Sequence, residues 1–223
     1  MENKFSRYLL YGLGEIVLVV IGIFIAIQLN KWQTVVNNQK KEKAFLVELH
    51  KESESNLQQF ENNKKAYFET LDACNVVLRN APSLEEPASR DSVLRYGPVL
   101  FRGITFDPSN GIIESLINTG NIQLIRNDTL RNYLITWKDV VKDFKEEEMD
   151  NELLLKNHVE PFLINNADFI NPSSPRNVEM LKDPRFLNMV ARRKFYTLSI
   201  LNAMDRESIE RNLNEIVRLS RTD

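Results

Sequence analysis

The feature that most constrains this chain is an apolar stretch near its N-terminus, from Tyr8 to Leu29. Twelve residues between Leu13 and Leu29 are Leu, Ile, Val or Phe, and each favours membrane insertion by about 0.3 to 0.6 kcal/mol. The one carboxylate, Glu15, costs at most about 3 kcal/mol, so insertion is favoured. A helix of this length spans about 33 Å, enough to cross a bilayer core. The sequence predicts a transmembrane helix over residues 8–32 after a short basic lead, residues 1–7.

A cleaved signal peptide is the main alternative for this stretch, because Lys4 and Arg7 precede it. The apolar run is longer than is usual for a signal peptide. No small-x-small cleavage site comes after it, since residues 27–31 are bulky or polar. We therefore predict an uncleaved anchor, with Tyr8, Tyr11 and Trp32 at the membrane interfaces.

Residues 5–32 read FSRYLLYGLGEIVLVVIGIFIAIQLNKW. This stretch resembles the N-terminus of a family of bacterial single-pass membrane proteins of unknown activity, which reads like KYLxYAxGEIxLVxIGILIALQINNW. Residues 115–131, SLINTGNIQLIRNDTLR, resemble that family's second recurring stretch, with its GNIxLI core. The chain departs from the pattern at Gly12, where Ala is usual, and at Lys31, where Asn is usual. The resemblance implies a membrane anchor and supplies no catalytic residue.

Length and composition limit the part of the chain after the anchor. Of 223 residues, about 190 remain, which is the size of one domain, here residues 33–223. The net charge of −2 gives no electrostatic footprint for nucleic acid, and we interpret the basic run Arg192–Lys194 as the polar face of a helix. A single cysteine, Cys74, excludes an internal disulfide.

Apolar residues at spacings of three, four and seven predict a long amphipathic helix over residues 40–80. Asn56 and Lys64 interrupt its apolar stripe as polar residues. This helix either continues the membrane helix or is separated from it by a joint at residues 34–38, whose helix propensity is poor.

Capping residues and prolines divide the rest of the chain. Gly97-Pro98 is expected to stop one short helix, Asp107-Pro108 to begin another, and Pro161 to kink or end a long one capped by Asn127 or Asp128. An Asn-, Ser- and Pro-rich loop is expected over residues 165–175. The predicted helices are short at 89–96 and 108–119 and long at 128–164 and 184–220.

These helices predict an all-α fold, in which a single N-terminal transmembrane helix is followed by an up-down helical bundle. No stretch shows sustained period-two alternation. The most β-like fragment, residues 121–125, is too short to stand alone. We therefore expect essentially no sheet.

The sequence gives little indication of a metal site or a catalytic site. His50 and His158 have Glu54 and Glu160 nearby in sequence, but Glu-x-x-His pairs are absent, and we expect both histidines at the surface or its boundary. The acidic run at residues 146–150 is expected to be a solvated helix face rather than a cation site. No nucleotide-binding or nucleophile motif occurs, so we expect neither enzymatic activity nor a cofactor.

One cluster of aromatic and basic residues is the best candidate for a small-molecule pocket. The alternative, and the commoner use of such residues, is to fill the core between helices. The cluster consists of Tyr96, Phe101, Arg102, Phe106 and Trp137.

Two functions remain open. The first is a structural or interaction protein that self-associates or joins another membrane protein; the second is a ligand-binding sensor, which would need a partner to signal because only about seven residues precede the membrane helix. We favour the first. Its predicted interface is one face of the membrane helix with a small-x-x-x-small pair, formed by Gly12, Glu15, Val19, Gly22 and Ala26.

Orientation is not decided by charge, since Lys4 and Arg7 oppose Lys31, Lys40 and Lys41 across the anchor. A short basic lead before a single anchor behaves like an uncleaved signal. We therefore predict a bacterial inner-membrane protein whose N-terminus is cytoplasmic and whose domain is periplasmic or extracytoplasmic.

Overall fold

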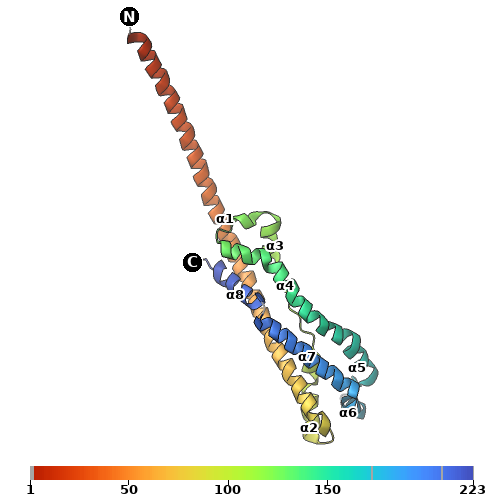
Figure 1. Cartoon of the computed structure of the whole chain (residues 1–223). Helices are drawn as coiled ribbons and strands as arrows, with labels where there is room; N and C mark the ends of the chain where they lie inside the picture. The colour runs from red at the N-terminus through yellow and green to blue at the C-terminus, as the bar shows by residue number, and fades with distance from the viewer. Residues whose placement is uncertain (1–2, 172, 207, 223) are drawn as a thin grey trace.

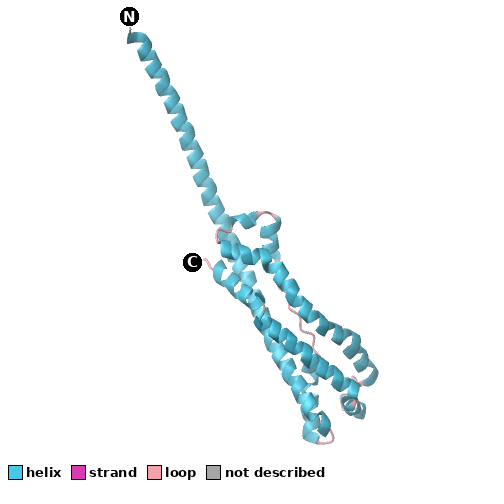
Figure 2. Cartoon of the chain, in the orientation of Figure 1, coloured by secondary structure: helices cyan, strands magenta, loops and turns pink. Residues whose placement is uncertain are grey.

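The computed structural model describes residues 3–171, 173–206 and 208–222. Within these residues every regular element is helical and no strand occurs, which confirms the predicted all-α fold (Figure 2). One long helix extends from an elongated bundle and leaves its N-terminal half free of the rest of the chain (Figure 1).

The long helix α1 runs unbroken from Asn3 to Asn80, which corresponds to about 117 Å. No joint interrupts it at residues 34–38, so of the two possibilities left open by the sequence the continuous helix is the one observed. The hydroxyl of Thr34 donates to the carbonyl of Asn30, one turn earlier, at 2.9 Å. This bond lets the polar residue be accommodated in the continuous helix.

The helix has two halves. No residue from 9 to 41 is buried, whereas Glu42 is 5% exposed and buried positions then recur to Val77. We call residues 9–41 the free half and residues 42–80 the packed half. The end of the bundle from which the free half leaves is called the proximal end, and the opposite end the distal end (Figure 1).

Four helices form most of the bundle with the packed half of α1. Helices α2 (Pro87–Leu100), α7 (Pro184–Arg206) and α8 (Ser208–Ser220) pack on α1, and α4 (Asp128–Leu154) packs on α7 and α8. Helix α3 (Gly111–Asn118) and the 3-10 helix η2 (Asn121–Leu124) lie at the proximal end; α5 (Glu160–Asn166) and α6 (Pro175–Lys182) lie at the distal end (Figure 1). A short 3-10 turn, η1, covers Ala81–Ser83.

Two helix boundaries predicted from the sequence are wrong. Helix α2 continues through Pro98 to Leu100, because packing buries Val93 and Leu100 on either side of the expected stop and outweighs the cost of the proline. Helix α3 begins at Gly111 rather than at Asp107-Pro108, because residues 102–110 are extended.

The predicted helix 128–164 is divided by a π-helical turn. Asn127 caps α4 by accepting the Leu130 N–H at 3.0 Å, as expected. The π-helical turn Leu155–Val159 then widens the helix just before Pro161. Proline has no N–H to donate to the α-helical hydrogen-bond pattern. Helix α5 begins directly after this turn. Helices α7 and α8 fill most of the range predicted as one helix, and residue 207 between them lies outside the described residues. The sequence does not predict helix α6.

The core has two apolar clusters. The first surrounds Phe60, Phe106 and Phe144, whose ring centroids lie 5.5 to 6.2 Å apart. The second lies in the distal half, where Cys74 and Leu100 are buried with Phe186. Both clusters connect α1 to segments distant in the sequence, so the packed half of α1 organises the whole bundle.

Candidate functional site

The predicted membrane-helix interface lies entirely in the free half of α1. A side chain added at Gly12 or Gly22 would meet no atom within 4 Å, and Val19 is 61% exposed. The most apolar window of the helix is long and apolar enough to cross a membrane, and none of it is buried in the protein. The predicted face is therefore not covered by any described part of this chain.

The five residues of the predicted pocket are not brought together. Trp137 and Phe106 are buried in the first core cluster, where the indole Nε1 of Trp137 donates to Asn110 Oδ1 at 2.6 Å. Tyr96 packs against the second cluster, and Arg102 pairs with Glu69 on α1 at 2.7 Å. Of the five, Phe101 alone lines the cavity between α2 and α6.

An extended segment, residues 102–110, runs along α1 from α2 towards the proximal end, and we call it the strap. Its backbone is bonded by side chains instead of by a neighbouring strand. Tyr67 donates to the carbonyl of Ile104 at 2.9 Å and Asn63 to that of Thr105 at 2.7 Å. Asn56 makes two bonds of 2.8 Å with the N–H and carbonyl of Ser109. Side chains of α1 thus bond the backbone of the strap, including the buried carbonyl of Ile104, which would otherwise lack a partner.

Glu148 of α4 holds the strap from the other side. Its carboxylate accepts the Phe106 N–H at 3.1 Å, and its Oε1 lies 2.8 Å from the Tyr67 hydroxyl, whose single proton it shares with the Ile104 carbonyl. Burial raises the pKa of Glu148, although these two donors act in the opposite direction. The prediction that the whole acidic run is solvated is therefore wrong at this residue. Its position four residues after the buried Phe144 was the signal in the sequence.

Arg193 of α7 is also buried, so the interpretation of its basic run as a polar face is wrong at this position. Its Nη2 donates to the carbonyl of Arg102 at 2.8 Å, and Nη1 donates to Asn151 Oδ1. Burial lowers the pKa of Arg193. This residue joins α7, α4 and the start of the strap.

The histidines do not form a metal site with the residues around them. His50 Nδ1 lies 3.0 Å from the carbonyl of Val217 and 3.1 Å from Ser220 Oγ, so it connects α1 to the end of α8. Its Nε2 lies 3.2 Å from Glu54. Among the residues that the structure describes, no three His, Cys, Asp or Glu side chains are grouped as metal ligands would be.

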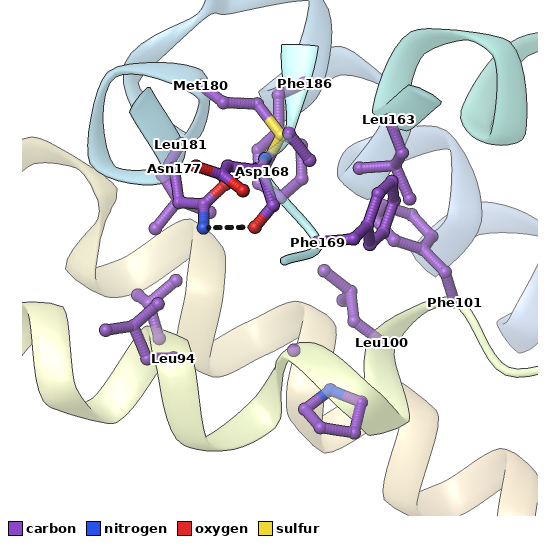
Figure 3. A pocket seen from close by; sticks show the side chains of 14 residues that line it. Leu94, Leu100, Phe101, Leu163, Asp168, Phe169, Asn177, Met180, Leu181 and Phe186 are labelled. Carbon is purple, nitrogen blue, oxygen red and sulfur yellow. Dashed lines mark hydrogen bonds between the residues drawn. The ribbon is translucent and has the colours of Figure 1, made fainter. Parts of the chain in front are cut away.

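A cavity of about 340 Å³ lies in the distal half, between α2, α6 and the loop after α5 (Figure 3). This volume is within the range of small-molecule sites. Its walls are mainly apolar, and two polar residues, Asp168 and Asn177, lie at one side. The apolar side chains labelled in Figure 3 are Leu94, Leu100, Phe101, Leu163, Phe169, Met180, Leu181 and Phe186.

A second cavity of about 470 Å³ adjoins the first and shares Phe101, Leu163 and Phe169 with it. It lies against the π-helical turn and α5, where Lys156 pairs with Glu152. The widened turn therefore shapes one wall of this second cavity, whereas the first cavity is formed by α2 and α6.

The first cavity is not predicted from the sequence, because the pattern indicates no helix at α6 and ends α2 too early. Helix α6 contributes Met180 and Leu181, but it has only eight residues, too few for a helical spacing of apolar residues to be recognised in the sequence. Its apolar side chains and aromatic rings suit the binding of a small molecule through apolar contact.

Comparison with known proteins relates part of the chain to a family. Residues 15–88 match a family of unknown function, DUF6090. The matched region includes most of the apolar stretch, the whole packed half of α1 and the start of α2. No curated protein and no solved structure matches the chain significantly.

Proposed function

We propose that this protein is a non-catalytic, membrane-anchored interaction protein that assembles through the free half of α1. The observation that carries the proposal is that this half has an apolar window long enough to cross a membrane, of which no part is buried in the protein. Such a surface needs lipid or another protein as its partner. The proposed partners are the bilayer and a second copy of the chain or another membrane protein.

One face of the free half supports assembly. Gly12, Glu15, Val19, Gly22 and Ala26 succeed one another at spacings of three and four, so they share a face. Gly22 and Ala26 allow two backbones to approach closely. A carboxyl at Glu15 is least costly when it hydrogen-bonds across a helix pair instead of facing lipid.

Crosslinking in native membranes tests this assembly. The double substitution Gly22→Leu and Ala26→Leu should reduce the size of the crosslinked species, because the added side chains separate the backbones. Ile23→Leu with Ile27→Leu is the matched control and should leave the ladder unchanged. Glu15→Gln should preserve the complex and Glu15→Leu should weaken it. An unchanged ladder in the Gly22/Ala26 variant contradicts the interface.

We further propose a bacterial inner-membrane location with a cytoplasmic N-terminus and a periplasmic or extracytoplasmic bundle. The support is the basic lead, Lys4 and Arg7, before an apolar run without a cleavage site. Alkaline phosphatase fused after Asp223 should be active, and green fluorescent protein fused there should be dark. The opposite pattern reverses the orientation.

A second candidate function is ligand sensing by the bundle, and the cavity of about 340 Å³ is the observation that favours it. Because α1 is continuous from the apolar stretch to the bundle, a change in packing near the cavity has a direct helical connection to the membrane. A thermal-shift screen of the full chain in nanodiscs should find a shift of several degrees with a specific ligand. An equal shift in the variant Gly97→Leu, whose added side chain occupies part of the cavity, would contradict this function.

A further inference from the structure

We propose that the cavity between α2 and α6 is a binding site for a small, uncharged, apolar molecule. The proposal deepens the second candidate function and rests on it, and it is independent of assembly through α1. Three properties of the site define the ligand. The side-chain amide of Asn177 is hydrogen-bonded within its own loop, the carboxylate of Asp168 lies at one side, and Gly97 leaves open space in the wall.

The polar groups of the cavity hold its own loop together. Asn177 Oδ1 accepts the Asp168 N–H at 2.7 Å, and Asn177 Nδ2 donates to the carbonyls of Asp168 and Asn171 at 3.0 and 3.2 Å. Figure 3 shows Asn177 bonded to Asp168 at one side of the cavity. Asp168 Oδ1 accepts the N–H groups of Ile170 and Asn171. Recognition by the Asn177 amide would require breaking bonds that hold the loop. The ligand is therefore recognised by apolar contact.

Charge excludes an anionic ligand. The Asn171 N–H bonded to Asp168 lowers the pKa of that carboxyl, which stays ionised at neutral pH beside the cavity. In the adjoining cavity Glu152 and Glu160 outnumber Lys156, which is already paired with Glu152. An acid bound here would meet like charges without a free cation among the lining residues. A ligand without negative charge avoids this cost, and the mainly apolar lining favours an uncharged molecule over a cation, which would lose its hydration there.

Aromatic rings give the site its shape. Phe101 and Phe186 meet edge to face at 5.8 Å, and Phe169 lines the cavity although it is 68% exposed. Such an exposed ring at the edge of an apolar cavity is expected where a ligand completes the packing. The site lies far along α1 from the apolar stretch, since Ala66, to which Arg102 of the strap is bonded, is about 55 Å along the helix from Leu29.

Gly97 provides the test. It lines the cavity, and a Cβ added there would meet no atom within 4 Å. Gly97→Leu should therefore occupy part of the cavity and obstruct ligand entry while favouring the helical conformation of α2. Arg95→Leu is the matched control, because it adds the same side chain to an exposed position of α2 that does not line the cavity.

The full-length protein in lipid nanodiscs should be photolabelled with adamantyl diazirine, an uncharged apolar probe, and the adducts mapped by mass spectrometry. We expect adducts on α6 beside those on the membrane helix, which serve as an internal reference. Gly97→Leu should lower the α6 adducts at least tenfold relative to that reference, and Arg95→Leu should not. Absence of α6 adducts, or equal labelling of Gly97→Leu, overturns the site.

Competition tests the ligand class. Unlabelled adamantane should suppress the α6 adducts at concentrations at least tenfold lower than adamantane carboxylate, and equal competition overturns the assignment of an uncharged ligand. The Gly22→Leu and Ala26→Leu variant should keep full cavity labelling. A failure of assembly and a failure of the cavity are therefore distinguished in the same samples.

Discussion

The two halves of α1 belong to one unbroken helix but have opposite relations between polarity and exposure. In the free half, Phe24 is 62% exposed and its neighbours are apolar, with no described residue packed on them. In the packed half, the polar residues Asn56 and Thr70 are buried. Apolar residues of the free half are therefore exposed, whereas some polar residues of the packed half are buried.

The difference shows what each half requires from its surroundings. Exposed apolar area near the N-terminus implies a lipid or protein partner outside the bundle. Buried polar groups are stable only when they are hydrogen-bonded, and Asn56 meets this condition through the strap. One helix can thus expose apolar side chains in one half and, in the other, bury apolar side chains such as Phe60 together with hydrogen-bonded polar ones.

The largest expected effect concerns the free half. Ile21→Arg combined with Phe24→Arg should release the protein from the membrane, because each arginine near the centre of a membrane helix costs about 2.5 to 3.5 kcal/mol. Carbonate extraction measures the membrane fraction. Phe68→Arg with Leu153→Arg, at exposed positions of the bundle, is the control and should leave the fraction unchanged. Equal retention of both variants would contradict the membrane role.

In the packed half, Glu148→Ala should lower the free energy of unfolding by about 3 kcal/mol, since it leaves the Phe106 N–H buried without a partner and removes a bond of Tyr67. Cys74 provides the measurement: it is buried and its pKa is raised to about 11 by burial, so its labelling requires opening of the structure. Glu147→Ala, at the exposed neighbouring position, should change the labelling by less than about 0.5 kcal/mol.

A smaller effect should depend on pH. The folded-state pKa of Glu148 is raised above 4.5, so its contribution to stability is present below pH 4.5 and is lost as pH rises through the folded pKa. The difference in unfolding free energy between the wild type and Glu148→Gln should therefore fall as pH increases above 4.5. Urea denaturation followed by Trp137 fluorescence in a Trp32→Phe background measures it. A difference that rises with pH would contradict the sign.

The smallest effect is expected at the boundary between the halves. Asn37→Pro should break the helix locally, at a cost of about 3 kcal/mol, but should change the stability of the bundle by less than about 0.5 kcal/mol because residues 33–41 are not packed. The rigid helical connection between the apolar stretch and the bundle should be lost. Distances between spin labels on the lipid and on the exposed Phe68→Cys site, with Cys74→Ala, should broaden.

Sequence patterns predict the helices that pack along one face, and they fail where a polar residue is buried. Leu130, Leu134 and Trp137 have helical spacing and are all buried as expected. Glu148 and Arg193 continue the same kind of spacing, but their charge predicts exposure to solvent. The five residues grouped as a pocket share only their residue types, and the structure distributes them between the core, the strap and the cavity.

The apolar stretch and the helical class can be predicted directly from the sequence, because composition and periodicity are properties of neighbouring residues. The continuity of α1, the passage of α2 through Pro98 and the strap between α1 and α4 emerge only in the folded chain. These features depend on partners far apart in the sequence, such as Phe106 and Glu148, which are 42 residues apart. Helical spacing places Glu148 on the buried face, but burial of its charge is stable only once such a partner is in place, and the local pattern does not show that partner.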